Sequence, residues 1–353
     1  MDRMSAKRII SWITLGLVAL ILFLARHELV KAWELLGTVN PLVLLLLIPL
    51  LLFTFYAASE IMFTYLMAKG SIKPTPWYER ARMALELNFV NHTLPSGGVS
   101  GISYMTWRLG KLGVSPGRAA SAQVVRYVAG FIAAAILIAV SVVIVTLDGN
   151  INRWIILVSS ALVTFMIIST IGLIFLVSSR KRMHAFADIS AKIINRTTRK
   201  LTRGRKRTLL SEKKIFTFFE DIHDDFLELR RDYKLLVVPV LWALAFTAAD
   251  ALLFAITFWA LGTPVNPAPL LIAYVLASVA GFIVVTPGGA GAYEAIMVAF
   301  LASAGIASGA AIAGIVLTRV IILLVTIAVG YLFYQNALGK YGKRQSRNPF
   351  KRN

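Results

Sequence analysis

The chain contains no cysteine, and this absence excludes any disulfide. It also lacks three catalytic signatures: the phosphate-cradling loop of nucleoside triphosphatases, the HExxH spacing of zinc enzymes and the GxSxG turn of serine hydrolases. We therefore expect no enzyme activity, no metal and no cofactor. If the protein moves a substrate, the energy must come from an ion gradient, a partner or the substrate's own gradient.

Acidic residues are scarce, with 17 Asp and Glu against 37 Lys and Arg, which gives a formal net charge of +20. Nucleic-acid-binding proteins carry such charges, but here the basic residues gather in hydrophilic loops and in the tail 340–353. Cytoplasmic loops that face anionic lipid have this pattern. The expected partners are therefore anionic lipid headgroups, and no nucleic acid is expected.

Long polar stretches are also few, because 58% of the residues are hydrophobic. Soluble domains are roughly 45–50% apolar, and several runs here approach the ~20 apolar residues that cross a bilayer. We predict an all-α polytopic protein of the cell (inner) membrane, with one domain over 1–339. The predicted full spans are 9–25, 41–67, 118–147, 153–178, 236–262 and 306–338.

The basic loops predict the orientation of these spans. The loop 179–235 carries 16 Lys and Arg against 8 Asp and Glu, and both termini are basic. All basic clusters fall on one side if the remaining apolar segments, 77–93 and 268–286, each belong to a unit that crosses the membrane an even number of times. The positive-inside rule then places both termini in the cytoplasm.

Each of these two segments runs into a Pro-Gly break, PSGGVSG at 95–101 and PGGAGAYE at 287–294. Proline and glycine interrupt a helix, and irregular backbone within a membrane must be buried in protein or line a wet cavity. We expect two re-entrant hairpins, although complete spans followed by short ones would also fit. The break residues are Pro95, Gly97, Gly98, Gly101, Pro287, Gly288, Gly289 and Gly291.

The two breaks predict an inverted repeat with halves at about 41–147 and 236–338. An offset of 192 residues maps Pro95 onto Pro287 and Gly97 onto Gly289, and the flanking apolar segments also match. The predicted topology makes corresponding spans run in opposite directions, as in many secondary transporters. The alternative is that two Pro-Gly turns match by chance.

Six ionisable residues lie within the apolar segments, and each costs about 2.5–3.5 kcal/mol or more at the bilayer centre when unpaired. Guanidinium groups suit phosphate oxygens, whereas the acids would attract a cationic headgroup or carry a proton. The structural alternative is simple ion pairing, Glu86 with Arg126 and Glu294 with Arg319. The candidate translocation residues are Glu60, Glu86, Arg126, Asp250, Glu294 and Arg319; Asn88, Asn91 and His92 are further candidates for a cavity lining.

The loop 179–235 contains a helical pattern of its own. Apolar residues recur at helical spacing between acids from Ile215 to Leu229, which predicts an amphipathic helix on the cytoplasmic face. The basic run 196–207 either contacts anionic headgroups or is a solvated loop. His223, within this segment, is expected on the surface.

The two breaks also carry a family resemblance. The motif PGGAGAYE, followed by Arg319, and the segment LPSGGVSGISYMTWRLG at 94–110 resemble the lysylphosphatidylglycerol synthase transmembrane region, a flippase-like domain family. The resemblance implies that Glu86, Arg126, Glu294 and Arg319, and more loosely Asp250, are functional charges. Family members are often fused to an aminoacyl-transferase domain, which this chain is expected to lack because it ends at Asn353.

We therefore expect a transporter that moves a polar phospholipid between leaflets, as a flippase or scramblase does. One alternative is a secondary transporter of a small ion or solute. Another is a scaffold that recruits a separate lipid-modifying enzyme, although broken membrane helices would then have no purpose. A homo-oligomer is compatible with each of these alternatives.

Overall fold

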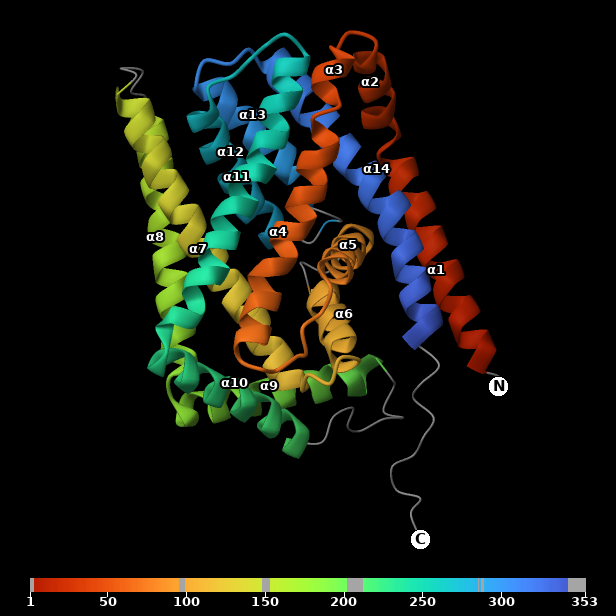
Figure 1. Cartoon of the computed structure of the whole chain (residues 1–353), viewed down its shortest axis with the longest axis vertical. Helices are drawn as coiled ribbons and strands as arrows, with labels where there is room; N and C mark the ends of the chain where they lie inside the picture. Colours follow the sequence, from red (N-terminus) through yellow and green to blue (C-terminus); the bar gives the residue numbers. More distant parts are fainter. Residues whose placement is uncertain are drawn as a thin grey trace.

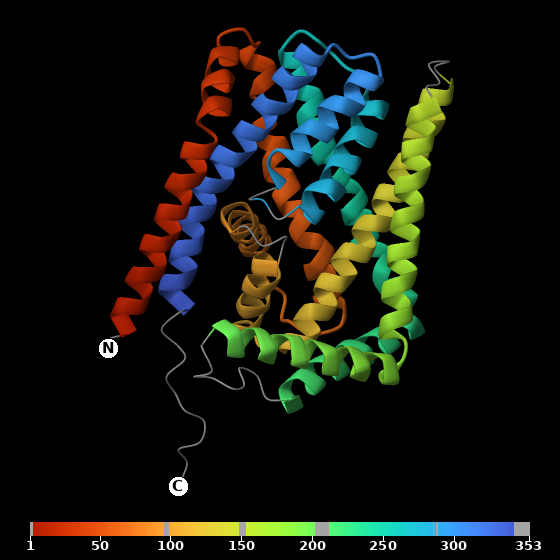
Figure 2. The same ribbon diagram turned by 180° about the vertical axis from the view of Figure 1, so that it is seen from behind.

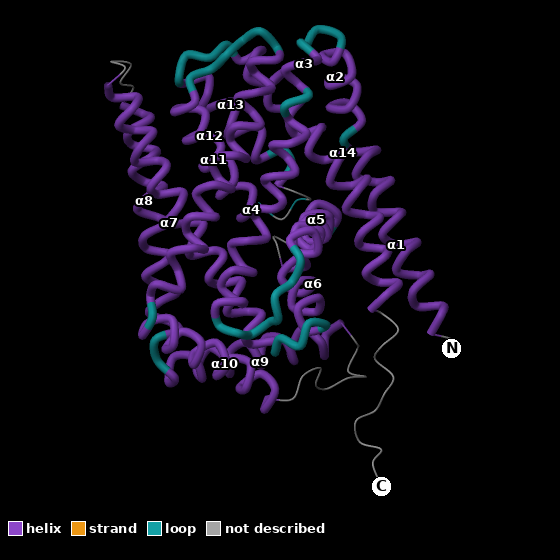
Figure 3. Tube along the Cα trace, in the orientation of Figure 1, coloured by secondary structure: helices purple, strands orange, loops and turns teal. Residues whose placement is uncertain are grey.

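The protein is an all-α membrane protein. The computed structural model describes residues 3–94, 99–147, 153–201, 212–284, 286 and 289–341, and no strand occurs among them (Figure 3). Most of the long helices run along the molecule, and two further helices lie across one of its ends (Figures 1 and 2). The helices are α1 Arg3–Leu24, α2 Arg26–Leu36, α3 Pro41–Leu44, α4 Leu47–Ala68, α5 Trp77–Thr93, α6 Val99–Gly110, α7 Pro116–Leu147, α8 Arg153–Val177, α9 Arg180–Leu201, α10 Glu212–Arg231, the 3₁₀ turn η1 Tyr233–Leu236, α11 Val237–Ala260, α12 Pro267–Ile283, α13 Ala292–Ser303 and α14 Ser308–Tyr341.

Five helical stretches of the described chain are long and apolar enough to cross a membrane: Pro41–Ala68, Pro116–Leu147, Arg153–Val177, Tyr233–Ala260 and Ser308–Tyr341. They match five of the six predicted spans. The sixth prediction, 9–25, falls in α1, whose apolar stretch Thr14–Leu24 is shorter. The apolar parts of α12 and α13 are also shorter than a bilayer crossing.

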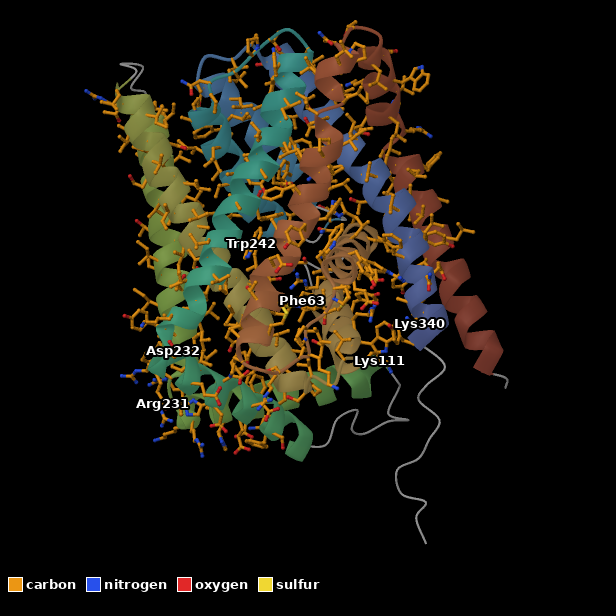
Figure 4. All side chains as sticks on the ribbon, in the orientation of Figure 1. Phe63, Lys111, Arg231, Asp232, Trp242 and Lys340 are labelled. Carbon is orange, nitrogen blue, oxygen red and sulfur yellow. The ribbon has the colours of Figure 1, made fainter. Side chains whose placement is uncertain are left out.

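The centre of the molecule is the contact between α4 and α11, which pack against each other along much of their length. One core cluster lies in the first half of the chain, around Phe63 and Tyr65 of α4 and Met105 of α6. A second gathers mainly residues of α11 to α14, including Phe258 and Met297. Figure 4 shows Phe63 and Trp242 at mid-height within the bundle. The second cluster also includes Ala134 and Ile138 of α7, so the cores of the two halves are joined.

Helices α9 and α10 lie across one end of the bundle (Figures 1 and 2). The start of α1 and the end of α14 lie at the same end, and so do the labelled charged residues Lys111, Arg231 and Lys340 (Figure 4). Helix α10 confirms the helix predicted from Ile215 to Leu229. The first part of the basic run, 196–201, is helical in α9, and its remainder, 202–207, lies outside the described residues.

Helix α10 is attached to the bundle by side chains on two of its faces. Its phenylalanines Phe218 and Phe226 pack in a cluster with Val177 and Met183. Its acids bind the loops and helix ends above them: Asp225 and Glu228 form ion pairs with Lys69, Asp221 accepts a hydrogen bond from the Ser115 hydroxyl at 3.1 Å, and Asp224 pairs with Arg180 at 3.0 Å. The helix is therefore a packed part of the fold.

The prediction that His223 lies on the surface is wrong. Its side chain is buried, and its Nδ1 lies 2.6 Å from the Val177 carbonyl oxygen. This imidazole turns inward because the last turn of α8 leaves carbonyl groups without partners inside the helix. The acids next to His223 suggested a solvated position, but they are themselves engaged with the bundle.

Candidate functional site

The described chain contains two short helical pairs, α5 with α6 and α12 with α13, each packed internally. Asn266 begins the second pair by capping α12: its side chain accepts a hydrogen bond from Ala268 N at 2.9 Å, and Pro267 occupies the first helical position. Helix α5 ends at Thr93 and helix α12 at Ile283, just before the two glycine-rich breaks. The breaks therefore end both helices at the places that the sequence predicts.

The described glycines of the breaks permit two close contacts and one positive-φ helix cap. Gly289 has φ +72°, and a Cβ on it would lie 2.7 Å from the Cα of Gly281. A Cβ on Gly101, in α6, would overlap the side chain of Asn91 in α5. Gly291 has φ +87° and caps α13. The remaining break residues, Pro95, Gly97, Gly98, Pro287 and Gly288, lie outside the described part of the chain.

Glu294 joins the second pair to α14. One carboxylate oxygen accepts a hydrogen bond from Gly291 N at 2.7 Å, which satisfies a donor at the start of α13. The other accepts a hydrogen bond from Arg319 Nε at 2.9 Å, and the guanidinium lies 4.2 Å from the centre of the Tyr293 ring. Both side chains of the ion pair are about a quarter exposed. The predicted pair between Glu294 and Arg319 is therefore present.

This ion pair lines a cavity of about 620 Å³ between the helices. Many of the lining side chains are polar, and they include four of the six predicted charges. Asn88, Asn91 and His92 also line it, as the sequence predicts. The polar lining consists of Asn88, Asn91 and His92 from α5, Arg126 from α7, Asp250 from α11, Tyr274 and Ser278 from α12, Tyr293 and Glu294 from α13, and Arg319 and Thr326 from α14, with Thr54 of α4 and Glu28 of α2.

The rest of the lining is apolar. Its residues are aliphatic or aromatic and come from α1, α4, α11 and α14, and the last three of these helices also supply polar lining residues. Leu24 at the end of α1 is 64% exposed, so the apolar lining reaches the surface of the protein. The residues are Ile21, Leu24, Leu51, Phe55, Phe246, Phe254, Val316, Val320, Ile322 and Leu323.

Three cavity charges have no ion pair in the described part of the chain: Arg126, Asp250 and the exposed Glu28. No described acid lies within 4 Å of an Arg126 nitrogen, and no described base lies within 4 Å of an Asp250 oxygen. Asp250 Oδ2 instead accepts a hydrogen bond of 2.6 Å from the Tyr274 hydroxyl. The cavity thus offers one guanidinium and two carboxylates without an ion pair to whatever enters it.

Glu86 and Glu60 do not line this cavity. Glu86 is completely buried, and its partners are Arg82 at 2.9 Å, Arg108 at 3.1 Å and the Tyr104 hydroxyl at 2.8 Å. The expected pair between Glu86 and Arg126 therefore does not form, because α6 brings Arg108 to Glu86 instead.

Glu60 has a partner from the neighbouring α5. Its carboxylate lies 3.1 Å from Arg80 Nε, and the Glu60 side chain is almost fully buried. The sequence does not mark Arg80, Arg82, Arg108 and Tyr104 as partners, because these arginines have the appearance of cytoplasmic charges near segment ends. Only the i, i+4 spacing of Arg82 and Glu86 gave a usable signal.

No group of three or more His, Asp or Glu side chains that could hold a metal occurs in the described ranges. The chemistry that the cavity offers is electrostatic and hydrogen-bonding. Guanidinium groups bind phosphate or carboxylate oxygens, and tyrosine hydroxyls and amides donate to the same kind of group. A molecule with a polar end and an apolar end would find partners for both ends in this lining.

Comparison with known proteins agrees with the resemblance that the two breaks suggest. A comparison with curated proteins finds no significant match to this chain. The family described as the lysylphosphatidylglycerol synthase TM region matches residues 9–330, which include the cavity and both helical pairs. The chain therefore belongs to the family of the lysylphosphatidylglycerol synthase transmembrane region.

Proposed function

We propose that this protein moves a polar phospholipid between the leaflets of a cell membrane. The observation that carries the proposal is the mixed lining of the cavity, which combines charged and hydrogen-bonding groups with apolar residues. A phospholipid has the same division into a polar headgroup and apolar chains. The cavity would let the headgroup cross the membrane without leaving polar contacts, while the chains stay against apolar surface.

The helical pairs support an inverted repeat around this cavity. Helices α5 and α12 both have 17 residues, and helices α6 and α13 both have 12. Helix α6 lies toward the end that carries α9 and α10, whereas α12 and α13 lie toward the opposite end (Figure 1). We infer two re-entrant hairpins that enter from opposite sides, with the α9–α10 end in the cytoplasm. Transporters with this design bind substrate between their repeats.

Each Arg of the cavity has a distinct task in this proposal. Arg126 has no described acid in contact and is available to bind the headgroup phosphate. Arg319 is held by Glu294 and stacked on Tyr293, which fixes the direction of its guanidinium. Two positioned cations on different helices would hold a phosphate more firmly than either alone, because guanidinium–phosphate contacts are charge-assisted.

The apolar part of the cavity lining favours a lipid substrate over a small ion or solute. A site for an inorganic ion needs a polar shell on all sides, because an ion loses its hydration when it enters. Here about half of the lining offers no hydrogen bond at all, and the exposed Leu24 connects that half with the surface. Acyl chains can pack against such apolar residues without the desolvation of any polar group.

Reconstitution in liposomes tests the proposal. Fluorescent phospholipids with several headgroups are placed in both leaflets, and a membrane-impermeant quencher measures how fast lipid from the inner leaflet becomes accessible. We expect movement above that of protein-free vesicles, and a loss of it in Glu294→Gln and in Arg319→Ala. Glu220→Gln is the matched control, because Glu220 is a half-exposed carboxylate on α10 away from the cavity. No movement by the wild-type protein with any lipid would overturn the proposal.

A further inference from the structure

Two acids at corresponding positions of the two halves, Glu60 and Asp250, have different partners. Glu60 is thirteen residues after the start of α4 at Leu47, and Asp250 is thirteen residues after the start of α11 at Val237. Glu60 has Arg80 as its ion-pair partner. Arg80 follows Glu60 by 20 residues in the sequence. The residue 20 positions after Asp250 is Leu270 of α12, which is an apolar core residue. The second half therefore has an acid, Asp250, at the position of Glu60, but an apolar residue at the position of Arg80.

Asp250 is left with a neutral partner and open access to the cavity. Its hydrogen bond comes from the Tyr274 hydroxyl, and the residue is only half-buried because it lines the cavity. An unpaired carboxylate at the bilayer centre costs about 2.5–3.5 kcal/mol or more. Binding a proton removes that charge, and the water that fills a polar cavity can deliver the proton.

The charged and titratable groups that share the cavity with Asp250 come from α2, α5, α7, α12, α13 and α14. Arg319 of α14 is already bound to Glu294 of α13. Tyr274 of α12 and Tyr293 of α13 are neutral groups. The others are Arg126 of α7, His92 of α5 and Glu28 of α2, whereas α4 contributes only the neutral Thr54. An anionic headgroup bound at Arg126 and Arg319 would therefore place a new negative charge in the cavity that Asp250 lines.

We propose that Asp250 binds a proton when an anionic headgroup enters the cavity, so that the proton and the headgroup cross the membrane together. This inference rests on the proposed function and gives it an energy source, a proton gradient. The physical reason is repulsion between like charges: the phosphate disfavours an ionised Asp250 in a region of low dielectric. The proton comes from water in the cavity and returns to water when the lipid leaves, so charge and atoms balance.

Calorimetry can count this proton directly. The purified protein in detergent is titrated with dioctanoyl phosphatidylglycerol, whose phosphodiester charge does not change near neutral pH. The titration is repeated in buffers with different ionisation enthalpies, and the dependence of the measured heat on the buffer gives the number of protons taken up. We expect proton uptake by the wild-type protein and none by Asp250→Asn, which keeps an oxygen for the Tyr274 hydroxyl and still binds the lipid.

Two comparison variants identify the source of the proton. His92→Gln removes the imidazole of the cavity, which is an alternative proton acceptor, and Glu220→Gln removes a half-exposed acid outside the cavity; both should retain the proton uptake. Lipid binding by the wild-type protein without proton uptake, proton release instead of uptake, or unchanged uptake in Asp250→Asn would overturn the inference alone. If no anionic or zwitterionic lipid binds at all, the proposed function itself fails, and the inference fails with it.

Discussion

Glu86 is expected to stabilise the fold far more than Glu294 does, although both are membrane acids of the same type. The perturbation is the nearly isosteric change Glu86→Gln. It removes one negative charge from a site where Arg82, Arg108 and Tyr104 all bind the carboxylate. Glu86 is fully buried, and the Arg108 side chain is 3% exposed. Water therefore cannot replace the lost partner.

The magnitude follows from this burial. Removing one member of a buried ion pair typically costs about 3–5 kcal/mol, because the remaining charge is left uncompensated. In Glu86→Gln the amide group would also turn a hydrogen-bond donor toward a guanidinium that can only donate. The comparison variant Glu294→Gln breaks a pair whose side chains are 21% and 26% exposed. Partly solvated pairs of this kind contribute about 1 kcal/mol or less.

The assay is equilibrium unfolding in mixed micelles with increasing denaturing detergent, followed by far-ultraviolet circular dichroism. We expect Glu86→Gln to lower the free energy of unfolding by about 3–5 kcal/mol and Glu294→Gln by about 1 kcal/mol. Lipid movement should show the reverse order, with Glu294→Gln inactive. A loss below about 1 kcal/mol for Glu86→Gln, or equal losses for the two variants, would refute the assignment of Glu86 as a structural residue.

Two further predictions concern the backbone of the second break and the attachment of α10. Gly289→Ala should lower the thermal stability more than Gly70→Ala, because both residues have positive φ but only Gly289 approaches another backbone. The positive φ alone costs a residue with a Cβ about 1–2 kcal/mol. Equal losses of stability in the two variants would contradict the close contact. The hydrogen bond with Lys69 lowers the pKa of Glu228. This contact therefore stabilises α10 at pH values above the usual pKa range of Glu, and the stabilisation is lost as the pH falls through the lowered folded-state pKa. Amide hydrogen exchange of α10 in the wild-type protein should accelerate as the pH falls through that acidic range. The change should correspond to less than about 1 kcal/mol, since Glu228 is exposed. In Lys69→Met this acid-dependent acceleration should be absent.

The helices could be predicted from the sequence because apolar length and Pro-Gly breaks are local signals. The breaks end α5 at Thr93 and α12 at Ile283, where the sequence places them. The pair between Glu294 and Arg319 was also predictable, because few charges occur in apolar segments and each needs a partner. The cavity-lining positions of Asn88, Asn91 and His92 followed from their location just before a break.

The partners of Glu86 and Glu60 could not be predicted in the same way. They depend on how α5 and α6 pack, which brings Arg108 and Arg80 into contact with acids that are distant in sequence. Arg80, Arg82 and Arg108 lie near polar segment ends and looked like ordinary cytoplasmic charges. His223 was misplaced for a related reason, because its inward direction depends on the end of α8.

The absence of cysteine permits a direct test of whether lipid passes through the cavity. Ser278→Cys introduces one thiol into the cavity lining, and Ser160→Cys introduces one on the exposed side of α8. Each variant is labelled with a bulky thiol reagent, and lipid movement in liposomes is measured before and after labelling. The account predicts that labelling at position 278 stops lipid movement and that labelling at position 160 does not. Unchanged lipid movement after complete labelling at position 278 would contradict a path through this cavity.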